Sequence, residues 1–136
     1  MSDAALALVT GATGYIGGRL VPELLDAGYR VRAMARHPER LEGRDWAQRV
    51  EVAAADATNP EDVARALAGV DVAYYLIHAL GSGPTFEQRD RATARRFAVA
   101  AREAGVGRIV YLGGLHPADE TLSPHLESRR EVGDIL

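Results

Sequence analysis

Apolar and polar positions along the chain fall into short blocks that predict strands and helices in alternation. Residues 4–9 form an apolar run that ends at a glycine-rich segment, which predicts a buried strand. Between residues 15 and 27 the apolar positions recur at helical spacing, and Gly28 follows where a helix is expected to end. Residues 29–35 then alternate in the manner of a strand until the polar break around Pro38.

The rest of the chain continues this order. A strand is predicted at 50–54, followed by a helix over 59–68 that begins with an N-cap asparagine, a first-turn proline and two acidic residues. A further apolar run at 70–77 predicts the fourth strand. Residues 86–104 predict the longest helix, and residues 108–112 predict a fifth strand.

Nearly continuous apolar strands that alternate with helices are typical of a parallel sheet covered on both faces. The predicted fold is therefore α/β, a doubly wound parallel sheet of about five strands in the order 3-2-1-4-5. Because the sequence shows no repeat or linker, residues 1–136 are expected to form a single domain. No sixth strand follows the amphipathic helix predicted at 124–136, so we expect the N-terminal portion of a larger fold, truncated before the usual later strands.

Three glycines, Gly11, Gly14 and Gly17, stand at three-residue spacing between the first predicted strand and the first predicted helix. Glycine permits a tight turn and lets a ligand approach the backbone closely. The N–H groups and the dipole at the start of the following helix favour a negative charge. In this context the spacing predicts a pyrophosphate-binding turn; the alternative is a glycine-rich turn that only connects two elements.

The segment TGATGYIG, residues 10–17, resembles the TGxxGxxG fingerprint of the short-chain dehydrogenase/reductase superfamily, in its extended and atypical branches. The similarity continues in VRAMARHPER, ADAT, VDVAYYLIHAL and RIVYLGG, and so covers nearly the whole chain. This combination is similar to NmrA-like and nucleoside-diphosphate-sugar-epimerase-like proteins. The resemblance implies a single NAD(P)-binding Rossmann domain whose glycine segment contacts the cofactor through Gly11, Thr13, Gly14, Tyr15, Ile16 and Gly17.

The residue at the end of the second predicted strand indicates which dinucleotide binds. An NAD-selective site has Asp or Glu there, about 20 residues after the glycine turn, to accept hydrogen bonds from the ribose 2′-hydroxyl. This chain has Arg36, whose guanidinium can bind a 2′-phosphate through two parallel hydrogen bonds. We therefore predict NADP(H), with Arg36 as the main selector and His37 and Arg40 as further candidates; the alternative is a solvated surface arginine.

Residues after the third and fourth predicted strands complete the candidate cofactor site. Asp56 and Ala57 resemble the family position where an Asp side chain and the next backbone N–H meet the adenine ring. The competing interpretation is that Asp56 caps the turn toward Asn59. Ile77 and His78 would border the cofactor, because ligands of open α/β sheets bind outside the carboxyl ends of the strands. The alternative for His78 is a packing role in the loop.

The usual catalytic residues of the superfamily are missing from the matching positions. The resemblance implies a Ser or Thr near the end of the fifth strand and a Tyr-x-x-x-Lys pair on the next helix. Here Gly113 and Gly114 follow the strand, and His125 and Arg129 stand at the spacing of the pair. His125 can move protons near neutral pH, but an exposed histidine at a helix start is the simpler interpretation. No catalytic residue is therefore assigned.

Composition narrows the remaining function classes. With 47% apolar and 26% charged residues the chain is typical of a soluble globular protein. The net charge of −3 and the spread of basic residues argue against a nucleic-acid partner, and no apolar run is long enough for a membrane span, so a cytoplasmic protein is expected. There is no cysteine, and the histidines lack metal-ligand spacing, so no metal site is expected.

Two residue types bear on mechanism. All 16 basic residues counted as lysine plus arginine are arginines, so no step can use a lysine side chain. Tyr74, Tyr75 and Tyr111 lie inside apolar strands, where a core position is expected rather than an acid–base role.

These patterns predict an NADP(H)-binding Rossmann protein related to reductases and nucleoside-diphosphate-sugar epimerases. If it is catalytic, the expected reaction is hydride transfer to or from a small organic substrate. Two rivals stay open: a non-catalytic regulatory binder of NmrA-like type that senses NADP(H), and a truncated inactive paralogue. Because a sheet that ends at its fifth strand exposes backbone and apolar surface, a homodimer or larger homo-oligomer is expected.

Overall fold

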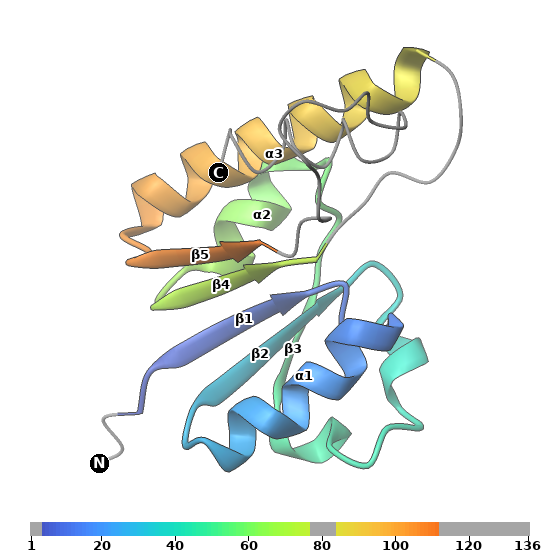
Figure 1. Ribbon diagram of the computed structural model, residues 1–136, viewed down its shortest axis with the longest axis vertical. Coiled ribbons are helices and arrows are strands. Elements are labelled where there is room, and N and C mark those ends of the chain that lie inside the picture. Colours follow the sequence, from blue (N-terminus) through green and yellow to red (C-terminus); the bar gives the residue numbers. More distant parts are fainter. Residues whose placement is uncertain (1–3, 77–83, 112–136) are drawn as a thin grey trace, which may run out of the picture.

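A computed structural model describes residues 4–76 and 84–111 of the chain. Five strands form one parallel sheet in the order β3-β2-β1-β4-β5, which confirms the predicted order (Figure 1). The strands are β1 (Leu6–Thr10), β2 (Arg30–Ala35), β3 (Glu51–Ala54), β4 (Val72–Tyr75) and β5 (Arg108–Tyr111). β2 and β3 lie on one side of β1, and β4 and β5 lie on the other. Successive strands are therefore added in one direction up to β3 and in the opposite direction from β4 onward.

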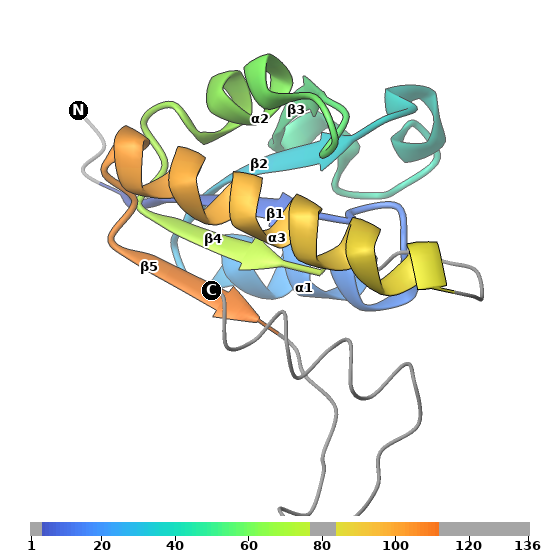
Figure 2. The ribbon, with the colours of Figure 1, turned by 90° about the horizontal axis from the view of Figure 1, so that it is seen from above.

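Helices cover the two faces of this sheet. They are α1 (Tyr15–Asp26), α2 (Pro60–Leu67) and α3 (Pro84–Ala104), with two short 3-10 helices, η1 (Pro38–Leu41) and η2 (Ala47–Arg49), between β2 and β3. α1 and the β2–β3 connection pack on one face, and α2 and α3 pack on the other (Figure 2). This division follows from right-handed crossovers, because the connections before and after the switch run in opposite directions across the sheet.

The local sequence sets where the helices begin and end. The side chain of Asn59 accepts hydrogen bonds from the backbone N–H groups of Glu61 and Asp62, at 3.0 and 3.2 Å, and so caps α2 as predicted. Both acidic residues lie in the first turn, where the helix dipole favours negative charge. The three α-helices are each followed by a glycine with positive φ, namely Gly28 (95°), Gly69 (77°) and Gly105 (80°).

Two apolar clusters, one on each face, hold the helices against the sheet. On the face of α2 and α3, Tyr75 is buried, and its ring meets that of Phe97 edge-on, with the ring centroids 5.0 Å apart. On the other face, the cluster combines side chains of β1, β2, α1 and the β2–β3 connection. Of the tyrosines predicted to lie in the core, Tyr75 is fully buried, whereas Tyr74 and Tyr111 are partly buried.

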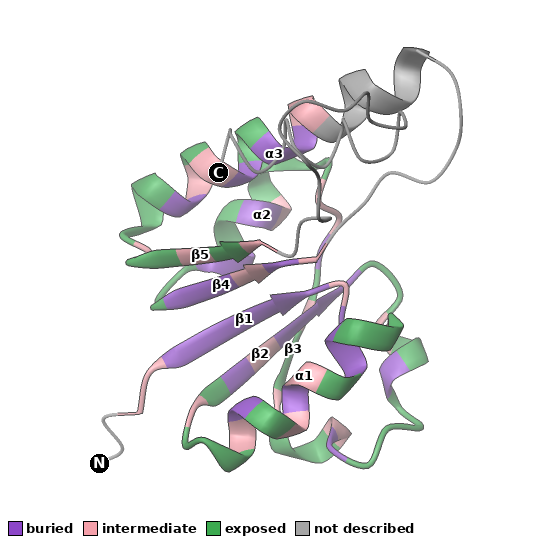
Figure 3. Ribbon diagram, in the orientation of Figure 1, coloured by how far each residue is buried: buried purple, intermediate pink, exposed green. Residues whose placement is uncertain are grey.

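Burial falls off from the centre of the sheet to its edges (Figure 3). All five residues of β1 are buried, but β3 is mostly exposed and β5 alternates between exposed and half-buried positions. The predicted covering of the sheet on both faces is confirmed at its centre, and the helices leave the edge strands β3 and β5 partly exposed. The helix predicted at 124–136 lies outside the described residues, and self-association stays a prediction.

Candidate functional site

The turn between β1 and α1 takes its shape from glycine. Gly11 has φ 65°, in the left-handed region that favours glycine, and a Cβ atom there would lie 3.2 Å from the carbonyl oxygen of Leu76. The N–H of Gly14 donates to the carbonyl oxygen of Gly11 at 3.0 Å, which closes the turn. Gly14 also caps α1 without a side-chain bond, and no acidic residue lies in the first turn of α1. The positive end of this helix is therefore suited to an anion from outside the chain.

Gly17 lies where α1 passes closest to the turn. A Cβ atom on Gly17 would overlap the carbonyl oxygen of Gly11 and lie 3.0 Å from the Cα of Ala12. These are backbone atoms, which cannot move aside as the end of a flexible side chain can. The third glycine is therefore required by the packing of the helix on the turn, a role that was not predicted for Gly17 from the sequence.

A buried hydroxyl group joins the two strands beneath this turn. The Oγ1 of Thr10, at the end of β1, donates to the carbonyl oxygen of Tyr74 at 2.9 Å and accepts from the N–H of Leu76 at 2.8 Å. Thr10 is completely buried. These two bonds fix β1 against the carboxyl end of β4, and so they set the position of Leu76 against Gly11.

A cleft of about 400 Å³ opens at the carboxyl ends of β1, β2 and β3. This volume is within the range of small-molecule sites. The described residues that line it are Gly11, Thr13, Met34, Ala35, Arg36, His37, Arg40, Ala55 and Ala57. They place the glycine turn and the exposed basic side chains after β2 at one cleft, and none of them is acidic.

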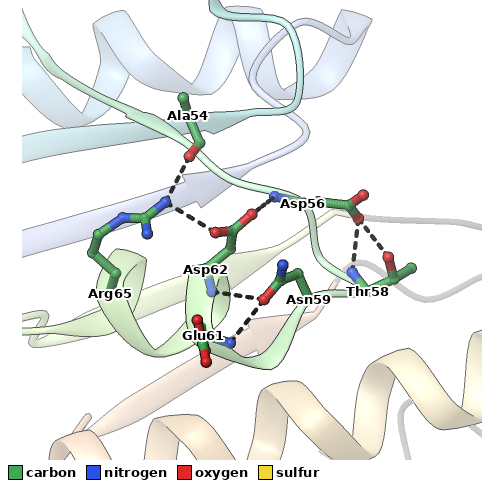
Figure 4. A network of polar contacts seen from close by, with 7 residues as sticks. All are labelled: Ala54, Asp56, Thr58, Asn59, Glu61, Asp62 and Arg65. Carbon is green, nitrogen blue, oxygen red and sulfur yellow. Dashed lines mark hydrogen bonds and ion pairs between the residues drawn. The ribbon is translucent and has the colours of Figure 1, made fainter.

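Asp56 forms a tight turn beside the cleft (Figure 4). Its Oδ1 accepts from the backbone N–H of Thr58 at 2.9 Å and from the hydroxyl of Thr58 at 2.7 Å. These two bonds lower the pKa of Asp56 below its ordinary value. Burial opposes them less strongly, and the charge of Arg36 lowers the pKa by a still smaller amount. The side chain of Asp56 thus closes a turn through Thr58, in line with the competing interpretation of this residue, and contact with adenine stays a proposal.

The first turn of α2 holds the backbone of Asp56 in place. Asp62 accepts from the backbone N–H of Asp56 through Oδ2 at 3.0 Å, and from Arg65 through Oδ1 at 3.0 Å. The same Arg65 nitrogen donates to the carbonyl oxygen of Ala54, at the end of β3, at 3.0 Å (Figure 4). The backbone N–H of Asp56, next to the cleft-lining Ala57, is thus bonded to α2, and Arg65 of α2 is bonded in turn to the end of β3.

The structure brings together only part of the predicted site. Of the predicted cofactor residues, the cleft is lined by Gly11, Thr13, Arg36 and Ala57, together with the two further candidates His37 and Arg40. Tyr15 and Ile16 are largely exposed at the start of α1, and the guanidinium of Arg19 lies 3.9 Å from the centroid of the Tyr15 ring. Ile77 and His78, which were predicted to border the cofactor, lie outside the described residues. So do Gly113, Gly114, His125 and Arg129, which stand at the positions of the usual catalytic residues.

Sequence reasoning missed the contribution of the β2–β3 connection. Arg44 donates to the carbonyl oxygen of Thr13 in the glycine turn at 3.0 Å, and the indole N–H of Trp46 donates to the carbonyl oxygen of Gly18 at 3.0 Å. Trp46 is buried, although it lies in a polar stretch. A lone tryptophan among polar residues was the available signal, because such a side chain is expected to find a packing partner.

The fold and this turn together define a dinucleotide-binding protein of the Rossmann type: a doubly wound sheet with a glycine turn and an uncapped helix start at its switch point. The chain belongs to the NAD(P)H-binding family, whose model matches residues 11–136. The residues present fit such a cofactor, because the glycine turn and the exposed Arg36 line one cleft whose described lining includes no acid, and the start of α1 has neither a side-chain cap nor an acidic residue in its first turn.

Known proteins of similar sequence and structure are oxidoreductases and related enzymes. The 3-beta-hydroxysteroid dehydrogenase of Mycolicibacterium neoaurum is 34% identical over 120 residues, which are 81% of this chain and 32% of that protein. The Citrobacter sp. triphenylmethane reductase, solved as a complex with NADP(H), is 27% identical with a TM-score of 0.78, over 96% of this chain and 44% of that one. The chain thus spans less than half the length of these proteins.

A second solved structure shows the same fold with the other nicotinamide cofactor. The short-chain dehydrogenase/reductase superfamily protein of Agrobacterium tumefaciens, with bound NAD, has a TM-score of 0.74 and 22% identity, over 96% of this chain and 43% of that chain. The chain therefore has the fold of this superfamily.

Within the described ranges, no helix has both the length and the apolar character that a membrane crossing needs.

Proposed function

We propose that the chain binds NADP(H) in preference to NAD(H) and forms the cofactor half of a reductase-type site. The observation that carries this proposal is the position of Arg36. It follows directly after β2, lines the same cleft as the glycine turn, and is accompanied there by His37 and Arg40. A guanidinium at this place can bind a 2′-phosphate with two hydrogen bonds.

The charges around the cleft support this choice. A carboxylate at the end of β2 would repel a 2′-phosphate, and the described lining residues include no acid. The charge of Arg36 lowers the pKa of Asp56 slightly. The described hydrogen bonds to the Asp56 carboxylate, however, both come from Thr58 and end on Oδ1, so none of them involves Arg36. Arg36 is exposed at the rim, so its guanidinium can turn toward a ligand.

The proposed roles of the other residues follow from their places in the cleft. The glycine turn and the first N–H groups of α1 hold the pyrophosphate, and the side chain of Asp56 and the backbone N–H of Ala57 meet the adenine. The bound nicotinamide supplies or accepts a hydride, and the protein positions it against a small organic substrate. The names of the similar proteins, a dehydrogenase and a reductase, support a redox reaction of this kind.

The test compares NADP⁺ with NAD⁺ by titration calorimetry for the wild-type chain, for Arg36→Asp and for Arg49→Asp. Arg49 is an exposed arginine on η2 and makes the same charge change away from the cleft lining. We expect the wild type to prefer NADP⁺, and Arg36→Asp to weaken NADP⁺ by about tenfold or more. Equal wild-type affinities, or an Arg36→Asp chain that still prefers NADP⁺, would refute the role of Arg36.

The assembly of the chain is a separate proposal. We propose that residues 1–136 act as one dinucleotide-binding domain and that the chain self-associates through the edge of the sheet at β5. Among the described strands, β5 pairs with β4 alone, and Val110 is 37% exposed. Sedimentation of a single species at the monomer mass would contradict the self-association.

A further inference from the structure

We propose that Arg44 is a positioning residue that fixes the glycine turn in the shape that accepts a pyrophosphate. Its Nη2 donates to the carbonyl oxygen of Thr13 at 3.0 Å, across 31 positions of the sequence. Thr13 lies inside the turn and lines the cofactor cleft, whereas Arg44 lines a separate groove on the outer side of α1. Arg44 therefore reaches the turn from outside the cleft.

The peptide group between Thr13 and Gly14 is held at both ends. Its carbonyl oxygen accepts from Arg44, and its N–H donates to the carbonyl oxygen of Gly11 at 3.0 Å. Because the two groups of a trans peptide point in opposite directions, these bonds fix the orientation of the whole peptide plane. The next residue along the chain, Tyr15, begins α1, so the same bonds also set how the helix start faces the cleft.

The main chain that carries Arg44 is itself held in position. The backbone N–H of Arg44 donates to the carbonyl oxygen of Leu41 at 3.0 Å, and the carbonyl oxygen of Arg44 accepts from the N–H of Ala47 at 3.1 Å. The main chain therefore forms one turn before Arg44 and another after it. Leu41 and Trp46, on either side, are buried in the cluster beneath α1. The β2–β3 connection is thus anchored before and after Arg44.

Gly18 makes room for this arrangement. A Cβ atom on Gly18 would lie 3.0 Å from Nη1 and 3.3 Å from Cζ of Arg44, so the guanidinium lies closer to this helix position than a side chain there would allow without a small shift. The carbonyl oxygen of Gly18 also accepts the indole N–H of Trp46. Gly18 therefore permits the close approach of the β2–β3 connection to α1, whereas Gly17 permits the close approach of α1 to the glycine turn.

A glycine-rich turn gains from such support. Glycine loses more conformational freedom than other residues when it is ordered, so a ligand that must order the turn binds more weakly. A turn that is already ordered avoids this cost, and the charge of Arg44 adds a favourable potential for an anion. This inference rests on the proposed role of the turn in pyrophosphate binding, but not on the preference for NADP(H).

The test measures two probes by titration calorimetry on the full chain. ADP-ribose carries the pyrophosphate and no 2′-phosphate, whereas 2′-AMP carries the 2′-phosphate and no pyrophosphate. We expect Arg44→Ala to weaken ADP-ribose by about tenfold and 2′-AMP by less than about twofold. Arg44→Lys keeps a charged donor and should recover most of the ADP-ribose affinity. Arg49→Ala, which removes an arginine from the same groove, is the matched control and should bind both probes as the wild type does.

Three results would overturn the inference: unchanged binding of ADP-ribose by Arg44→Ala, an equal loss for both probes, or an equal loss in Arg49→Ala. Thermal unfolding of each variant without ligand shows whether Arg44→Ala lowers the stability of the whole domain. Failure of the proposed NADP preference would appear differently, as equal wild-type affinity for NAD⁺ and NADP⁺. In that case the ADP-ribose comparison still tests Arg44, because this probe does not need the 2′-phosphate.

Discussion

The carbonyl oxygen of Gly11 occupies the space in which a side chain on Gly17 would begin. This contact joins the end of the first strand to the first turn of the following helix, and it involves only backbone atoms on the Gly11 side. It brings the start of α1, which lacks a side-chain cap, directly onto the turn that lines the cleft. The helix dipole therefore acts at short range on whatever occupies that turn.

Gly17→Ala is expected to reduce both stability and ligand binding. The added methyl group must displace backbone, which costs roughly 1–3 kcal/mol for overpacking of this kind. Gly14→Ala is the matched contrast, because its Cβ would meet the same oxygen of Gly11 at 3.3 Å and the backbone of Gly14 is extended. Thermal unfolding and ADP-ribose titration should show the larger loss for Gly17→Ala; equal losses would contradict this steric account.

Thr10→Val is expected to destabilise the domain through lost hydrogen bonds. Valine has nearly the shape of threonine, so the change removes the hydroxyl that joins Tyr74 and Leu76 and leaves a buried N–H without its acceptor. We expect a loss of about 1–3 kcal/mol in the free energy of unfolding, measured in urea.

Thr10→Ser separates the two functions of this side chain. Serine keeps the hydroxyl and loses one methyl group, for an expected cost of about 1 kcal/mol. If Thr10→Ser were as destabilising as Thr10→Val, packing rather than hydrogen bonding would explain the burial of Thr10.

Asp62→Ala is expected to loosen the turn that borders the cleft. It removes the acceptor of the Asp56 N–H and the partner of Arg65, for a cost of about 1 kcal/mol at this partly exposed site. Glu61→Ala removes the same charge from the same helical turn and is therefore the control for the dipole effect. NADP⁺ titration should show weaker binding for Asp62→Ala than for Glu61→Ala. Equal affinities of the two variants would contradict the inference that Asp62 holds the turn at Asp56 in place for cofactor binding.

The pKa of Asp56 predicts a component of acid sensitivity. Thr58 holds this pKa below its usual 3.8, so the folded state binds fewer protons than the unfolded state in that range. The stabilisation is therefore present above the unfolded-state pKa and is lost as the pH falls through the lower, folded-state value. Asp56→Asn lacks this ionisation, and its melting temperature should fall less than that of the wild type between about pH 6 and pH 2. Parallel curves for the two chains would contradict the assignment.

The fold was predictable because its information is local and repeated. The alternation of strands and helices indicates a parallel sheet, and Asn59 and the glycines after the helices mark where helices begin and end. Residue periodicity does not tell which strands lie at an edge, so the exposure of β3 and β5 required the structure. The exact ends of a strand also required the structure. The fourth strand was predicted over the apolar run 70–77, whereas β4 spans Val72–Tyr75.

The site was predictable where one residue's own chemistry determines its place. Gly11 and Arg36 line one cleft because the carboxyl ends of neighbouring parallel strands share an edge of the sheet. The contacts of Arg44 with Thr13 and of Asp62 with Asp56 were not predictable, since they depend on the path of a loop and on the direction of a side chain. No pattern of apolar positions encodes either.

The chain contains one tryptophan, and Trp46 lies buried with its indole N–H bonded to the carbonyl oxygen of Gly18 in α1. Tryptophan fluorescence of the folded chain therefore comes from a single position in the β2–β3 connection, bonded to the helix whose start faces the glycine turn. Nucleotide titrations can use this signal with the unmodified protein, and a change in emission would report on the contact between the β2–β3 connection and α1.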